Sequence, residues 1–121
     1  MKYLLLVHHD EEAFGRMSET KRKEMLAESV QLTHQLHDDG QYLSASPLHP
    51  ASTATIVRVR EGQSLVTDGP FVETREQLAG YFLVNVKDLG EAVRIATRVP
   101  GARIGTVEVR PLIEITGLPN K

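Results

Sequence analysis

The chain contains no cysteine. This absence excludes a disulfide framework, a thiolate nucleophile and zinc or iron–sulfur sites built on cysteine. Long hydrophobic runs are absent as well. The opening MKYLLLVHHDEE carries one lysine, and its apolar run breaks at His8, so it is too short for a signal peptide or a membrane-spanning helix. We therefore expect a cytoplasmic protein that has no membrane association.

An excess of charge of one sign is also missing. The formal net charge is -2 at pH 7 and the pI is about 6.2, which argues against a nucleic-acid partner. The nine glycines form neither GxGxxG nor GxxxxGK, so no phosphate-binding loop is predicted. No serine stands in a GxSxG setting. These absences leave two classes, a small-molecule enzyme and a binding or regulatory module.

The residues that are present suit one small domain. A chain of 121 residues, 40% of them hydrophobic, buries a modest core and is too short for a second domain, so we expect a single domain over residues 1–121. Hydrophobic periodicity, caps and turns predict a polar loop at 10–17 and helices at 18–39 and 88–99. They also predict strands at 3–7, 42–45, 80–87 and 106–115, and a hairpin of 54–60 with 64–67.

This order is βαββαβ with a hairpin inserted in the middle, an α+β arrangement of ferredoxin-like type with both helices on one face of the sheet. The strands at 3–7 and 80–87 are apolar on both faces, whereas two helices cover only one. A second subunit is the simplest cover for the other face. The pattern therefore predicts a homodimer that pairs as a dimeric α+β barrel.

The segment 66–81, VTDGPFVETREQLAGY, is the most informative stretch. Asp68 ends a strand, and Pro70 stiffens the backbone and lacks an N–H, so the chain must leave the sheet there. Phe71 offers an apolar wall and Arg75 a group that can orient an anion. One interpretation makes Asp68 a general acid or base whose pKa is set by burial and by Arg75. The other makes Asp68 a turn cap.

The same segment resembles the signature of the DGPF-domain proteins of the YCII-related family. The likeness rests on Asp68-Gly69-Pro70-Phe71, on the following ETREQL and Gly80-Tyr81, and it extends to the opening strand and to the closing VEVRP. It implies a ferredoxin-like fold paired as a dimeric barrel. It also implies a role that is mostly unassigned, with some members encoded beside or fused to extracytoplasmic-function sigma factors.

Five histidines invite a metal hypothesis. His34 and His37 share a helix, but no HExxH motif or third ligand stands nearby, so we predict neither a metal nor another cofactor. His8 and His9 end the first strand and point to opposite faces, so one of them faces the helix-free side and the other lies under or beside the helices; His8 shares its face with Leu4 and Leu6 and is a candidate pocket residue. In YCII-related proteins that resemble enzymes, a helix histidine pairs with an aspartate before a glycine; Ser29 stands where that histidine would fall, so this mechanism does not carry over.

Two hypotheses for function follow. The first is a small-molecule enzyme of isomerase, dehalogenase or lyase type, with Asp68 as the candidate catalytic residue. The second, which we favour, is a non-catalytic binding or regulatory module in which the DGPF segment is a turn and a dimer contact. In both, the candidate binding residues are His8, Phe71, Arg75 and Tyr81.

Overall fold

The computed structural model describes residues 1–119. Strands, α-helices and 3₁₀ turns follow in the order β1 (Lys2–His9), α1 (Glu11–Arg16), α2 (Glu19–Asp38), β2 (Tyr42–Pro47), η1 (Ala51–Thr53), β3 (Thr55–Arg60), β4 (Gln63–Asp68), β5 (Gln77–Asn85), α3 (Leu89–Arg98), η2 (Pro100–Arg103) and β6 (Thr106–Pro111). Four strands form an antiparallel sheet in the order β2-β5-β1-β6. This α+β architecture is consistent with the predicted ferredoxin-like fold.

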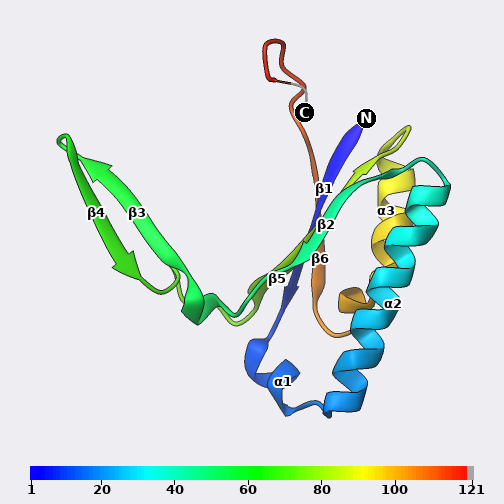
Figure 1. Ribbon diagram of the computed structural model, residues 1–121, viewed down its shortest axis with the longest axis horizontal. Helices are drawn as coiled ribbons and strands as arrows, with labels where there is room; N and C mark the ends of the chain where they lie inside the picture. The colour runs from blue at the N-terminus through cyan, green and yellow to red at the C-terminus, as the bar shows by residue number, and fades with distance from the viewer. Residues whose placement is uncertain (120–121) are drawn as a thin grey trace.

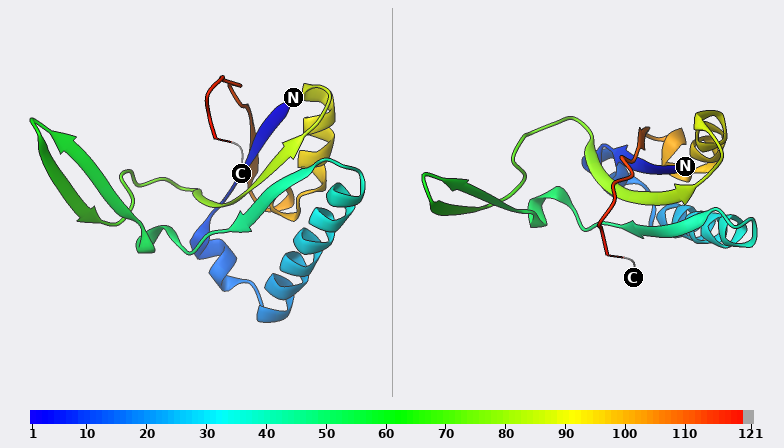
Figure 2. Two further views of the ribbon diagram at one scale, coloured as in Figure 1. Left: turned by 45° about the horizontal axis from the view of Figure 1, so that its top comes forward. Right: turned by 90° about the horizontal axis from the view of Figure 1, so that it is seen from above.

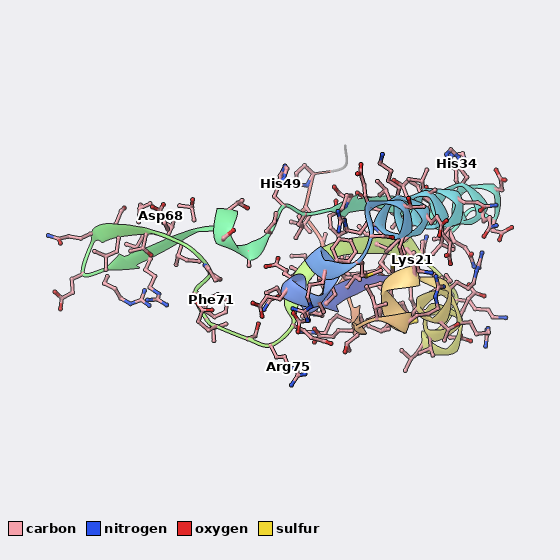
Figure 3. All side chains as sticks on the ribbon, turned by 90° about the horizontal axis from the view of Figure 1, so that it is seen from below. Lys21, His34, His49, Asp68, Phe71 and Arg75 are labelled. Carbon is pink, nitrogen blue, oxygen red and sulfur yellow. The ribbon has the colours of Figure 1, made fainter. Side chains whose placement is uncertain are left out.

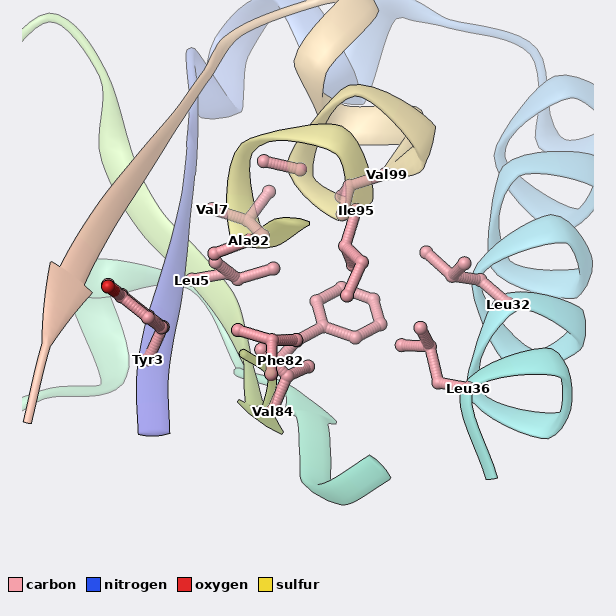
Figure 4. Packing of buried hydrophobic residues seen from close by; sticks show 12 residues of the cluster. Tyr3, Leu5, Val7, Leu32, Leu36, Phe82, Val84, Ala92, Ile95 and Val99 are labelled. Atoms are coloured by element: carbon pink, nitrogen blue, oxygen red, sulfur yellow. The ribbon is translucent and has the colours of Figure 1, made fainter. Parts of the chain in front are cut away.

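The helices α2 and α3 cover one face of the sheet (Figure 1). Side chains that face them alternate along the central strands β1 and β5, which is the two-residue period of a strand. Figure 4 shows these side chains interlocking with those of the two helices. The resulting core consists of Tyr3, Leu5, Val7, Leu32, Leu36, Phe82, Val84, Val86, Ala92, Ile95, Ala96 and Val99.

Local signals fix the ends of the helices as the sequence predicts. The Ser18 hydroxyl accepts a hydrogen bond from the Lys21 N–H at 3.1 Å, which caps α2. The Asp88 carboxylate accepts from the Glu91 N–H at 2.9 Å and caps α3. Gly40, with φ of 71°, takes the left-handed conformation that stops α2.

Three local predictions were wrong. Residues 10–17 are not a loop, because the Asp10 carboxylate accepts from the Ala13 N–H and starts α1. The buried face of α2 is formed by Met25, Leu32 and Leu36, whereas Leu26 and Val30 are about half exposed. The last strand ends at Pro111, opposite Tyr3 near the start of β1; the Leu112 N–H still donates to the Lys2 carbonyl at 3.0 Å, and residues 112–115 are not in strand conformation.

The strands β3 and β4 form the predicted hairpin, which we call the arm (residues 55–68). They pair with each other in a sheet of their own and join no strand of the main sheet. The arm projects from the side of the main sheet opposite the helices (Figures 1 and 2). A hydrogen bond of 2.7 Å from the Gly69 N–H to the Ala54 carbonyl closes its base.

Candidate functional site

A cavity of about 300 Å³ lies between α2 and the β2–β5 half of the sheet. Its wall is mostly aliphatic and aromatic, which is typical of small-molecule sites. The lining residues are Val7, His9, Phe14, Arg22, Met25, Leu26, Ser29, Val30, Thr33, Tyr42, Ala45, Ser46, Pro47, Ala79, Gly80, Tyr81, Phe82, Val99, Pro100, Gly101 and Ile104.

The half-exposed residues of α2 explain why the cavity exists. Met25, Leu26 and Val30 all line the cavity; Met25 is buried, whereas Leu26 is 53% and Val30 is 48% exposed. Leu26, Val30, Thr33 and Leu36 recur at helical spacing in the sequence, a pattern that predicts a buried face for Leu26 and Val30. In the fold these two side chains line the cavity instead of filling it.

His9, the last residue of β1, is a titratable residue that lines the cavity. Its ring stacks on Phe14 of α1, with centroids 4.4 Å apart and an interplanar angle of 19°. Burial lowers the pKa of His9 below its ordinary value, although the carboxylates of Glu11, Glu76 and Asp10 act in the opposite direction. The imidazole is therefore neutral near pH 7 and offers a ligand one donor and one acceptor.

Arg22 of α2 lines the cavity and carries a positive charge. One guanidinium nitrogen, Nη1, donates to the carbonyl oxygens of Gly15, at 3.2 Å, and of Met17, which ties α2 to the end of α1. Arginine has five N–H donors in total, so this clamp leaves others for a ligand. An anionic or strongly accepting group is the natural partner for such a side chain.

The predicted site residues do not lie in one place within the chain. His8 and Tyr81 are on the helix-free face, where the His8 ring lies 3.3 Å from the Glu108 carboxylate and the Tyr81 hydroxyl 3.0 Å from that of Ser44. Asp68 ends the arm and Phe71 follows it, both exposed, as Figure 3 shows. Within residues 1–119 the Asp68 carboxylate forms no ion pair.

Arg75 lines a second, polar groove of about 420 Å³. The groove lies between α1, η1 and the segment that follows the arm, and its other charged residues are Asp10, Glu11, Glu12 and Glu73. Glu11 has a structural role there, because its carboxylate accepts from the Ala51 N–H at 2.8 Å. The DGPF segment therefore shapes a groove through Pro70 and Val72, while Asp68 and Phe71 lie outside its wall.

Sequence reasoning missed His9 and the cavity. It placed His8 and His9 on opposite faces, which the structure confirms, but it selected His8 as the pocket residue. The available signal was that His9 shares its face with Tyr3, Leu5 and Val7, the side chains that the helices cover.

Nowhere in residues 1–119 do three His, Cys, Asp or Glu side chains gather as a metal site would require. Over the same residues, no helix is long and apolar enough to span a membrane.

The fold and the cavity define a small α+β protein with a four-stranded antiparallel sheet, a separate two-stranded arm and an apolar pocket under α2. A family model for the YCII-related domain matches residues 1–116, and the chain therefore belongs to that family. An uncharacterized protein of Rhizobium meliloti (strain 1021) is 31% identical over 114 residues, covering 93% of this chain and 92% of that protein. The similarity thus extends over both chains almost completely.

Proposed function

We propose that the protein is a homodimeric, non-catalytic binding or regulatory module whose small-molecule ligand occupies the cavity between α2 and β2–β5. The observation that carries this proposal is the cavity itself: an apolar wall with a neutral His9 and the charge of Arg22 at its edge. A ligand that fits this chemistry has an aromatic or aliphatic body and one polar or anionic group.

Binding without catalysis is favoured by the composition of the wall. Among residues 1–119, no aspartate or glutamate lines the cavity, so His9 has no carboxylate partner inside it for paired acid–base chemistry. A regulatory link to an extracytoplasmic-function sigma factor is supported by the family resemblance alone.

A second candidate function is a small-molecule enzyme. It is favoured by the lowered pKa of His9, since a neutral imidazole in an apolar pocket is a suitable general base. An alternative enzyme site, separate from the cavity, would use Asp68 as the candidate general acid or base on the helix-free side of the sheet, where His8 lies. Monitoring a bound ligand by NMR separates the two functions, because an enzyme converts the ligand whereas a binding module leaves it unchanged.

Thermal shift with benzoate-sized carboxylic acids and their amides tests the proposed ligand class. A ligand that binds the folded state raises the melting temperature, and a preference for acids over amides would point to Arg22. Ser29→Phe fills the cavity and should abolish the shift. The matched control is Gln31→Phe on the exposed side of α2, which should keep it. If no compound shifts wild type, or if Ser29→Phe responds equally, the cavity is not a ligand site.

A further inference from the structure

The arm has two chemically different faces. The pairing register puts Thr55, Val57, Val59, Ser64, Val66 and Asp68 on one face, because directly paired residues share a face and alternate along each strand. We call this the valine face. The opposite face carries Ile56, Arg58, Arg60, Gln63, Leu65 and Thr67. The arm is therefore apolar on one side and cationic on the other.

No segment of residues 1–119 covers the valine face. Val57 is 63%, Val59 is 60% and Val66 is 63% exposed. Two strands alone are at best marginally stable in water, and they need a further hydrophobic layer. Contiguous exposed apolar residues on a hairpin are typical of an interaction surface.

The main sheet offers a matching surface. Its helix-free face carries Leu4, Leu6, Tyr81 and Leu83, which are only partly covered. The arm projects to this same side of the sheet (Figure 1). Any molecule that packs on the helix-free face therefore meets the arm as well.

We infer that the arm of each copy docks its valine face on a second copy of this chain, whose helix-free face packs against that of the first. This inference rests on the proposed homodimer and specifies its contacts. Each chain has one valine face and one helix-free face. In a two-fold dimer each of these faces is covered by the other chain, so neither is left exposed. A standard interface takes about 20–30 residues from each partner, which the arm and one face of a four-stranded sheet can supply together.

The docked arm gives Asp68 a new environment. Asp68 lies on the valine face, at the end of β4 and directly opposite Thr55. Docking that face carries the carboxylate from solvent into the subunit interface, on the side of the sheet where His8 and Tyr81 lie. The site predicted around the DGPF segment is thus incomplete in one chain and is shared between two.

The test compares neighbouring arm residues on opposite faces. Val66→Asp should convert the dimer to a monomer of 13.4 kDa in light scattering at micromolar concentration, because it buries a charge in the interface. Leu65→Asp, one residue away on the cationic face, should stay dimeric. Circular dichroism should show the same fold in both, since the arm pairs with no strand of the main sheet.

A second measurement uses the absence of cysteine. Val66→Cys should react with a thiol reagent about tenfold more slowly than Leu65→Cys, since reaction requires access. The difference should vanish on dilution to monomer. A monomeric wild type would overturn both the homodimer and the docked arm. A wild-type dimer that survives Val66→Asp, or equal labelling of the two thiols, would overturn the docked arm alone.

Discussion

At the scale of single residues, the position of His9 makes stability depend on pH. Its pKa is lowered mainly by burial, so the unfolded chain binds a proton more readily than the folded one. Stability then falls as the pH drops through the ordinary histidine pKa of about 6.5 and stops falling below the folded-state value. We expect the melting temperature of wild type to drop more between pH 7.5 and 5 than that of His9→Gln. His34→Gln, at an exposed position of α2, should behave like wild type.

Asp68 is the candidate catalytic residue of the sequence analysis, with a turn cap as the alternative role. The Asp68 carboxylate is exposed and has no ion-pair partner within residues 1–119, so Asp68→Asn should change the free energy of unfolding of the monomer by about 0.5 kcal/mol or less. Loss of ligand binding or turnover at unchanged stability would identify a functional acid. Gly69→Ala is the backbone control, because Gly69 has φ of 89°, where alanine is strained. Denaturant unfolding gives both values, and an Asp68→Asn variant that unfolds would make the acid architectural.

At the scale of elements, the close approach of β2 and β5 depends on Gly80. A Cβ atom there would lie 2.8 Å from the Ser46 carbonyl oxygen and 3.1 Å from the Pro47 Cα. Gly80→Ala should therefore push the strands apart and cost about 1–3 kcal/mol in chemical denaturation, as overpacking does. Gly15→Ala is the matched control, since nothing lies within 4 Å of its Cβ position in α1, and it should be neutral or stabilising. Equal effects of the two substitutions would contradict this account of Gly80.

Helices and strands could be predicted from the sequence where interactions between residues close in the chain determine them. The cap at Ser18, the capping box at Asp88 and the turn around Gly62 act within a few residues, so the sequence alone located α2, α3 and the arm. The cavity was not predictable in this way. The exposure of Leu26 and Val30 depends on how far α2 stands from the sheet, which periodicity does not encode. Asp68 was predicted to end a strand, and it ends β4; that this strand belongs to an arm apart from the main sheet is a tertiary property that the local pattern does not encode.

At the scale of the whole molecule, no metal is expected to hold the fold together. The core is apolar, and residues 1–119 bring no three potential ligands into one cluster. EDTA should accordingly leave the melting temperature unchanged within error, and elemental analysis should find no stoichiometric metal. A drop of many degrees would show that one or more of the five histidines has been misread.

Assembly gives the remaining prediction for the whole molecule. If the helix-free face and the valine face are covered only in the dimer, part of the apolar burial that stabilises the fold comes from the second chain, at about 25 cal/mol per Å². Folding is then linked to association, and the melting temperature must rise with protein concentration. We expect such a rise for wild type and Leu65→Asp over a hundredfold dilution series in scanning calorimetry, whereas Val66→Asp should melt lower and independently of concentration. A wild-type melting temperature that stays constant across the series would mean that one chain is stable with both faces exposed.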